Sequence, residues 1–434
     1  MKPTNYRWRV VALLFCATTI NYIDRQVLAQ LKPFLTDDLG ISESEYGFIV
    51  SAFQAAYAIG MLVAGRFIDK YGTRISYALS ISIWSLAGCL HAAATGFYSL
   101  AGARFLLAIG ESGNFPAAIK TITEWFPKKD RALATGIFNS GSNIGAIVAP
   151  PLVTFLALRY SWRMAFLITG MLGFIWLVFW LLLYNTPKRM RGISAEELEY
   201  IQDTSACSSP DEDEQKENSS GNKSDLKSIF STKERRKVAI GICICRFIAD
   251  WPWWFFLFWT PDFLKKTFDL DLTATVVPLM VIYIISDVGS IFGGWLSSFM
   301  IKQGMDVKRA RALSLLICAS TVLPVMAIPY CNGLTVAVAI ISLACFSHQA
   351  WAANIYTVVS DNFPKEQVGT MTAAVGFCGA VGGIIAASAV GLILEWTQSY
   401  QLIFCVASVA YLAGWTILQL FLKRKKTSLK IIKY

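Results

Sequence analysis

The sequence predicts an all-α membrane protein with twelve transmembrane helices, arranged as two pseudo-symmetric halves of six helices each. Hydrophobic residues make up 55% of the 434 residues and charged residues only 16%. The mean hydropathy of +0.49 is too apolar for a soluble protein of this length. Twelve successive stretches are apolar and reach the roughly 20 residues that span a bilayer. Two parts of the chain also repeat each other at a constant distance in the sequence.

The twelve apolar stretches fall into two groups of six, separated by a polar interval. The first group lies near 8–31, 46–65, 75–94, 97–120, 132–158 and 163–184. The second group lies near 237–264, 274–300, 311–330, 334–360, 368–394 and 401–422. The predicted domains are therefore an N-terminal half (1–184), a cytoplasmic linker (185–236), and a C-terminal half with a short basic tail (237–434).

The linker is predicted to be largely flexible. Its interior, SACSSPDEDEQKENSSGNKSD, contains too few apolar residues to form a core. Its start, GISAEELEYIQ, differs because Ser194 and Glu197 have the spacing of a helix capping box. A short surface helix is therefore expected there.

Lysine and arginine predict the orientation in the membrane. The loops on the side of the two termini hold twelve of these residues, against five in the opposite loops. Because positive charge accumulates in short cytoplasmic loops, both termini are expected in the cytoplasm. The net charge of +10 and the tail KRKK at 423–426 fit attraction to an anionic membrane surface, so nucleic-acid binding is not expected.

The ten cysteines predict neither a disulfide framework nor a metal site. Nearly all lie within apolar stretches, where cysteine behaves as a small hydrophobic residue. No cluster of histidine and cysteine accompanies them. We expect no metal and no cofactor other than protons as a coupling ion.

The internal repeat relates the two halves. EWFPKKDRALATGIFNSGSNIGAIVA from Glu124 matches DNFPKEQVGTMTAAVGFCGAVGGIIA from Asp361 at a constant offset of 237. The repeat is parallel, because six helices return the chain to the same side of the membrane. The same offset places His348 opposite Glu111, each about halfway through its stretch. Two polar groups at equivalent depths indicate a shared central site.

Four ionisable residues lie inside the first and fourth stretches: Asp24, Arg25, Arg104 and Glu111. A charge at the centre of a membrane helix costs roughly 2.5 to 3.5 kcal/mol on insertion scales. A neutral structural network is one interpretation. A functional cluster is favoured, because replacing buried ion pairs by hydrophobic residues is often neutral or stabilising.

The functional interpretation separates the roles of the four residues. Arginine keeps its proton and forms a planar fork that suits a carboxylate, so Arg25 and Arg104 are predicted to hold an anionic substrate. Asp24 and Glu111 can change protonation, because burial and a neighbouring arginine act in opposite directions on a carboxyl group. They are the predicted proton-coupling residues.

The second half is predicted to contact the uncharged part of the substrate. Aromatic faces combined with hydrogen-bonding groups suit a polyhydroxylated ring, and the candidates are Trp253, Trp254, His348, Gln349 and Asn354. For the tryptophans, packing against lipid or neighbouring helices is an equally good interpretation. Arg246 and Asp250, four residues apart on one helix face, have a simpler interpretation in which they neutralise each other.

The twelve stretches, the division into two sixes and the central linker resemble the major facilitator superfamily. GRFIDKYGTR at 65–74 resembles the loop of that superfamily between its second and third helices. The resemblance implies that Asp69 pairs across an inner gate, while Gly65, Gly72 and Arg74 allow the tight turn. A charged turn that obeys the charge bias is the simpler interpretation. The corresponding second-half segment, GGWLSSFMIKQGMDVKRAR, lacks the acid.

A finer resemblance is carried by INYIDRQ, YAIGMLVAGRFIDKYG and RFLLAIGESGNFPAA, which look like the anion:cation symporter branch. Members of this branch import sugar acids and other organic anions. GSNIGAIVAPP, RFIADWPWWFFLFWTPDFL and FSHQAWAANIYTVVSDNFP are most similar to bacterial hexuronate transporters. The resemblance implies Tyr57 as a substrate contact, and Ser142 and Asn143 are further candidates within GSNIGAIVAPP.

The expected function is proton-coupled symport of hexuronates such as glucuronate and galacturonate, by alternating access, without enzymatic chemistry. We expect a monomer in the cytoplasmic (inner) membrane of a bacterium, with a small sugar acid and the lipid bilayer as its partners. Transport of another organic anion such as an aldonate, or exchange instead of symport, is the first alternative. A transporter-like sensor or a membrane enzyme is less favoured, because the sequence shows neither a folded cytoplasmic extension nor a P-loop.

Overall fold

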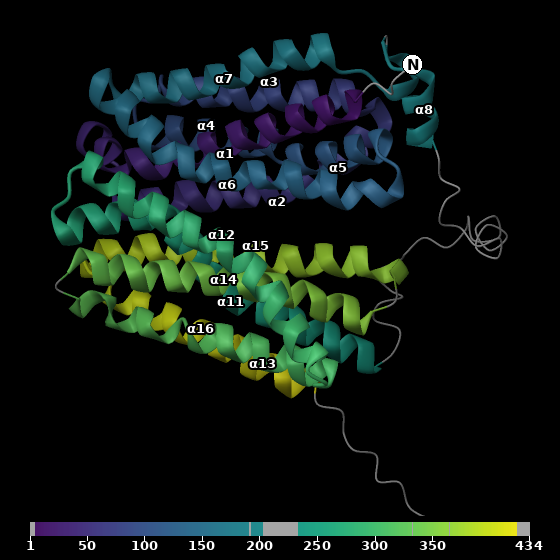
Figure 1. Cartoon of the computed structure of the whole chain (residues 1–434). Coiled ribbons are helices and arrows are strands. Elements are labelled where there is room, and N and C mark those ends of the chain that lie inside the picture. The colour runs from purple at the N-terminus through teal and green to yellow at the C-terminus, as the bar shows by residue number, and fades with distance from the viewer. Residues whose placement is uncertain (1–4, 191, 203–232, 332, 364, 423–434) are drawn as a thin grey trace, which may run out of the picture.

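The computed structural model is a bundle of long α-helices and describes residues 5–190, 192–202, 233–331, 333–363 and 365–422. The two halves of the chain lie alongside each other, and most helices run along the length of the bundle (Figure 1). The linker interior and the basic tail 423–426 lie outside the described residues. Residue 191 and the single residues 332 and 364 are the other internal gaps.

The N-terminal half contains seven long helical segments and a short helix in the linker. They are α1 (Tyr6–Leu39), α2 (Glu43–Tyr71), α3 (Thr73–His91), α4 (Phe97–Glu111), α5 (Asn114–Trp125), α6 (Lys128–Arg159), α7 (Trp162–Leu183), the 3-10 turn η1 (Pro187–Arg189) and α8 (Ala195–Gln202). The C-terminal half contains α11 (Lys233–Phe268), α12 (Leu272–Lys302), α13 (Val307–Ser320), η4 (Leu323–Tyr330), α14 (Leu334–Asn362), α15 (Lys365–Thr397) and α16 (Gln401–Leu422). Helix α11 thus begins four residues before the predicted start at 237.

The twelve predicted spans correspond to these helices, two of them in broken form. Within the described residues, nine helices are long and apolar enough to cross a membrane. The other three predicted spans are α1, α3 and the pair α4 and α5. The ninth span combines α13 with η4. The all-helical membrane architecture predicted from composition is therefore confirmed.

We call the end of the bundle where α1 starts and α16 stops the terminal end, and the other end the opposite end. Helix α1 stops at the opposite end at Gly40, which has a φ of 65° and donates its N–H to Thr36 O at 3.1 Å. Ser42 and Glu45 then form a reciprocal capping box that starts α2. The chain therefore reverses direction over only three residues.

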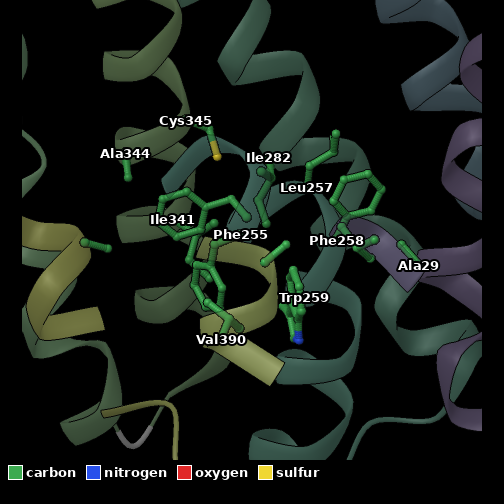
Figure 2. Close-up of a cluster of buried hydrophobic side chains, with 14 of the residues drawn as sticks. Ala29, Phe255, Leu257, Phe258, Trp259, Ile282, Ile341, Ala344, Cys345 and Val390 are labelled. Carbon is green, nitrogen blue, oxygen red and sulfur yellow. The ribbon is translucent and has the colours of Figure 1, made fainter. Parts of the chain in front are cut away.

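The two halves share a buried apolar core near the opposite end. One cluster joins residues of α1 and α2, such as Ala29 and Tyr46, with residues of α11 to α16. Figure 2 shows Ala29 of α1 next to Phe258 of α11 in this cluster. A second cluster lies at the terminal end. Among the described residues, all of its members belong to the N-terminal half and the start of the linker, from Val10 to Ile201. The apolar contact between the halves is therefore concentrated at the opposite end.

Two glycines allow the halves to approach closely there. A Cβ atom on Gly47 of α2 would lie 2.6 Å from Ala387 O and 3.0 Å from the Gly391 Cα of α15. Because a real Cβ needs more space than this, the contact requires glycine at this position. The same use of small residues is common where membrane helices pack closely.

Helix α8 caps the first helix at the terminal end. The predicted surface helix is present, and Ser194 Oγ accepts from Glu197 N at 3.2 Å. The Glu197 carboxylate is buried and accepts from Tyr6 N and Arg7 N, each at 3.1 Å. It therefore satisfies two N–H groups at the start of α1 and attaches the beginning of the linker to the N-terminal half.

Replacing Glu197 by alanine is expected to lower the free energy of unfolding by about 1 kcal/mol, the typical cost of losing a helix cap. Thermal unfolding of the purified protein followed by intrinsic tryptophan fluorescence measures this effect. The exposed Glu199 on the same helix provides the control substitution Glu199→Ala. Equal melting temperatures for the two variants would show that the capping contact contributes nothing.

Candidate functional site

The centre of the N-terminal half contains a buried ion pair between Arg25 of α1 and Glu111 of α4. Arg25 Nη2 and Nε donate to Glu111 Oε2 at 2.7 and 3.0 Å. Arg25 is 3% exposed and Glu111 is fully buried. Two of the four predicted ionisable residues thus form a direct ion pair, although they are 86 positions apart in the sequence.

Glu111 lies at the point where the predicted fourth span breaks. The continuous helix expected over 97–120 is wrong, because α4 ends at Glu111 and α5 begins at Asn114. Pro116 has no N–H to donate to Ser112 O, and its ring crowds that carbonyl. The Ser112 hydroxyl donates to Ile109 O, in the last turn of α4, at 2.7 Å. The break places the Glu111 carboxylate at a helix end in the middle of the protein.

Arg104 holds the backbone of α1 in place. Its Nη2 donates to Arg25 O at 2.8 Å, and its Nη1 lies 3.5 Å from Asp24 O. The guanidinium carbon also lies 4.4 Å from the centre of the Phe53 ring, and Arg104 is fully buried. Arg104 therefore fixes the part of α1 from which the Arg25 side chain projects.

Asp24 and Arg25 face different neighbours, as the 100° rotation between adjacent helical residues predicts. The Asp24 carboxylate lies near Arg104 and near Thr169 of α7. Asp24 is 3% exposed, and within the described residues neither of its oxygens accepts a hydrogen bond that meets the usual geometric limits. It is therefore a buried carboxyl group that takes no part in the hydrogen bonds between Arg25 and Glu111, although the Glu111 charge lies near it.

Aromatic rings surround the Arg25 guanidinium. Its central carbon lies 4.8 Å from the ring centres of Tyr22 and Tyr57 and 5.4 Å from that of Phe53. Such contacts stabilise a cation while leaving its hydrogen-bond donors to an anion. The structure thus brings the predicted residue Tyr57 to Arg25. Tyr22 and Phe53 were not predicted, although Tyr22 lies inside the INYIDRQ motif.

In the second half, two of the predicted residues form an aromatic pair. Trp253 of α11 stacks on His348 of α14, with ring centres 4.8 Å apart and planes 8° apart. His348 Nδ1 forms a hydrogen bond with the Tyr411 hydroxyl at 2.8 Å. The imidazole is therefore held between an indole face and a phenol, and Tyr411 is a partner that the sequence did not indicate.

Equivalent glycine contacts show that the two pairs occupy matching positions. Gly145 of α6 lies against Thr19 O of α1, and Gly382 of α15 lies against Phe247 O of α11. These glycines are related by the offset of the internal repeat, so Thr19 corresponds to Phe247. Six residues further along each helix come Arg25 and Trp253. The Arg25 and Glu111 ion pair therefore corresponds to the Trp253 and His348 stack.

The remaining predicted contacts lie outside these two pairs. Ser142 Oγ donates to Asn139 O, Asn143 is half-buried beside it, and Gln349 is half-buried on α14. Asn354 is fully buried and donates to Gly293 O at 2.8 Å, which ties α14 to α12. Trp254 lies nearer the opposite end, beside Phe255 and Trp259.

The inner-gate motif forms a tight turn at the terminal end. Gly72 has a φ of 79° and donates its N–H to Ile68 O, which ends α2. Arg74 Nη2 donates to Leu181 O of α7 at 2.8 Å. Gly65 lies within α2, and the Asp69 side chain lies outside the described residues. The pairing implied for Asp69 therefore stays a prediction.

A network of charged residues that the sequence did not predict joins the halves at the opposite end. Lys32 of α1 contacts Glu43 of α2 and Asp262 of α11, each at 2.7 Å. Lys266 contacts the same two carboxylates, at 2.5 and 3.3 Å. The Tyr400 hydroxyl adds a hydrogen bond to Asp262 at 2.5 Å. We call these five residues the closing network.

Replacing Asp262 by asparagine is expected to open the opposite end, because two lysines would then share only Glu43. Removing one partner of a buried ion pair typically costs about 3 to 5 kcal/mol. Deuterium uptake by residues 30–47, measured by hydrogen exchange and mass spectrometry, should increase. The exposed Asp269→Asn is the control. Unchanged exchange in Asp262→Asn would mean that the closing network does not hold the halves together.

Comparison with known proteins identifies the family. A model of the Major Facilitator Superfamily matches residues 14–387, most of the chain. The chain belongs to this superfamily. This major facilitator protein is a multi-pass membrane transporter and not an enzyme, which confirms the predicted class.

The transporter is similar to curated carriers of sugar acids. It is 31% identical to the hexuronate transporter of Escherichia coli K12 over 423 residues, covering 96% of this chain and 95% of the relative. It is 34% identical to the galacturonate transporter of Dickeya chrysanthemi over 68% of this chain and 82% of the relative. A D-galactonate transporter of Escherichia coli O6:H1 is 29% identical over 95% of each chain.

Solved structures agree on the fold. A D-xylose–proton symporter superposes with a TM-score of 0.74 at 13% identity, covering 97% of this chain and 99% of the other. A bacterial homologue of the human lysosomal transporter Spinster, in an inward-facing and unoccupied conformation, superposes with a TM-score of 0.71 at 18% identity. That match covers 96% of each chain. At these identities the likeness concerns the fold alone.

Proposed function

We propose that this transporter imports hexuronates, such as glucuronate and galacturonate, together with protons. One observation carries the proposal: an arginine paired with a buried glutamate and enclosed by aromatic rings corresponds, in the other half, to a tryptophan stacked on a histidine. A hexuronate has one carboxylate and one polyhydroxylated ring. The two halves thus offer one group for each part of this substrate.

Arg25 is the proposed carboxylate ligand. The substrate carboxylate and Glu111 compete for the same guanidinium donors, because Arg25 Nε and Nη2 both donate to Glu111 in the structure. Protonation of Glu111 removes its negative charge and releases these donors to the substrate. Proton uptake and substrate binding are thereby coupled at one pair of residues.

The other charged residues support this pair. Arg104 is committed to the α1 backbone, which favours a positioning role over direct substrate contact. Within the described residues, the Asp24 carboxylate accepts no hydrogen bond of the usual geometry, and Asp24 is the second proposed protonation site. Trp253 and His348 are the proposed contacts of the sugar ring, with Tyr57 next to the carboxylate.

The conformation supports transport by alternating access of the two halves. The charge bias in the loops supports a cytoplasmic position for the terminal end. The closing network and the shared apolar core then lie on the external side, which favours an inward-facing state. Access from outside would require the halves to separate at the closing network. We propose that a monomer in a bacterial inner membrane performs this cycle.

An aldonate is the second candidate substrate. It is favoured by the similarity to the D-galactonate transporter. An aldonate shares the carboxylate that Arg25 would bind but presents an open chain in place of a ring to Trp253.

Uptake by proteoliposomes tests the proposal. Purified protein is reconstituted, and accumulation of labelled glucuronate is measured with and without an inward proton gradient, with galacturonate, galactonate and glucose as competitors. Gradient-dependent accumulation blocked by galacturonate, but not by glucose, is expected. Absence of glucuronate accumulation, together with accumulation of labelled galactonate, would replace the hexuronate by an aldonate. Equal accumulation with and without the proton gradient would contradict symport.

A further inference from the structure

A second buried arginine and carboxylate pair lies on α11, outside the two pairs described above. Arg246 Nε lies 3.0 Å from Asp250 Oδ2, and each side chain is 9% exposed. Within the described residues, Arg246 Nη1 and Asp250 Oδ1 are buried without a hydrogen-bond partner. The Arg246 guanidinium also lies 5.2 Å from the centre of the Tyr356 ring of α14. The Arg246 guanidinium is therefore a buried cation whose Nη1 donor is unused.

The packing around Asp250 leaves room for this pair. A Cβ atom on Gly379 of α15 would collide with Asp250 Oδ2, and Arg246 Cγ would lie 3.2 Å from it. The glycine therefore allows a carboxylate to sit against α15 beside Arg246. If Asp250 served only to neutralise Arg246 on the same helix, the neighbouring helix α15 would not need a glycine at position 379.

The correspondence between the halves places Asp250 beside the central site. Three residues after Thr19 and Phe247 come Tyr22 and Asp250, so these two positions are equivalent. The Tyr22 ring flanks the Arg25 guanidinium at 4.8 Å. Asp250 precedes Trp253 by three residues, about one turn of the same helix. A carboxylate at the equivalent position therefore lies about one helical turn from Trp253, the proposed contact of the sugar ring.

We propose that Asp250, by pairing with Arg246, restricts this transporter to sugar acids with a single carboxylate and excludes those with a carboxylate at each end. This inference rests on the proposed function. Asp250 neutralises Arg246, so a second substrate carboxylate meets a guanidinium whose charge is already balanced by another carboxylate. Without the Asp250 charge, Arg246 presents the same kind of donor fork that Arg25 presents in the other half. In the native protein the paired carboxylate withholds the Arg246 donors from a second substrate carboxylate, which is a form of discrimination against the wrong substrate.

Competition experiments test the inference. The inhibition constants of glucarate and galacturonate are measured against uptake of labelled glucuronate, and their ratio is compared among variants. The native protein should be inhibited at least ten-fold more strongly by galacturonate. Asp250→Asn should reduce this preference by about ten-fold or more. In the double variant Arg246→Gln/Asp250→Asn, inhibition by glucarate should again be weak relative to inhibition by galacturonate, because stronger glucarate binding requires the Arg246 charge.

A control and a second variant keep the test decisive. Asp287→Asn, on α12, neutralises a half-buried carboxyl group of the same half and should leave the ratio within two-fold of the native value. If Asp250→Asn does not fold, Arg246→Gln provides the test, because an unpaired Asp250 should increase the preference against glucarate at least three-fold. An unchanged ratio in either variant, or native inhibition by glucarate equal to that by galacturonate, overturns the inference. Absence of glucuronate uptake by the native protein contradicts the proposed function instead.

Discussion

Replacing Arg25 by alanine is expected to weaken glucuronate binding by about two orders of magnitude or more. Truncating one member of a buried, hydrogen-bonded charge pair costs about 2 to 5 kcal/mol. Here the lost guanidinium is the proposed ligand of the substrate carboxylate, and three aromatic rings already hold it in place. Isothermal titration calorimetry of the purified protein with glucuronate measures the affinity directly, without any requirement for transport.

Two further variants separate binding from folding. Arg25→Lys keeps the charge but loses the planar fork, so it should bind more weakly than native and more strongly than Arg25→Ala. Arg163→Ala removes another hydrogen-bonded arginine of the same half, which donates to Ala94 O at 3.3 Å near the opposite end. It should bind normally. Native affinity in a folded Arg25→Ala protein would mean that the substrate carboxylate binds elsewhere.

The sequence predicted which residues gather at the centre better than it predicted their partners. Helical periodicity was enough to expect that Asp24 and Arg25 diverge, and they do. The pairing of Arg25 with Glu111 rather than with Asp24 depends on how α1 rotates against α4. Arg104 contacts backbone carbonyls, and every residue has a carbonyl, so no side-chain pattern could identify these acceptors.

The contacts between the two halves could not be predicted from the sequence either, because they depend on how the halves pack against each other. Lys32 and Asp262 are separated by 230 positions and meet only because the two halves close at one end. A single sequence does not specify which end of a two-state protein is closed. The break after Glu111, by contrast, could have been predicted from the sequence. Pro116 removes one backbone donor of the helix that was expected to continue.

The repeat illustrates how far pattern reasoning reaches. A constant offset related Glu111 to His348, but the offset does not extend to α1 and α11, where the loop lengths differ. The correspondence of Arg25 with Trp253 required the contacts of Gly145 and Gly382. This correspondence changes the interpretation of the site, because it shows that one half carries charge where the other carries an aromatic face.

Replacing Glu111 by glutamine is expected to retain exchange of labelled glucuronate across the membrane and to abolish accumulation driven by a proton gradient. Glutamine keeps a side-chain oxygen near Arg25 but cannot bind or release a proton at neutral pH. The variant therefore mimics the protonated state in which Arg25 is free for the substrate. Affinity should consequently be retained, while its dependence on pH should be reduced.

Counterflow and gradient-driven uptake in the same proteoliposomes measure the two activities separately. Asp24→Asn is the informative comparison, because Asp24 is the other buried carboxyl of the cluster but does not contact Arg25 through its side chain. If Glu111→Gln accumulates substrate as well as the native protein while Asp24→Asn does not, coupling resides at Asp24. Glu111 would then serve only to neutralise Arg25 inside the membrane. Loss of both exchange and accumulation in a folded Glu111→Gln protein would instead mean that substrate binding needs the carboxylate itself, which contradicts competition between Glu111 and the substrate for Arg25.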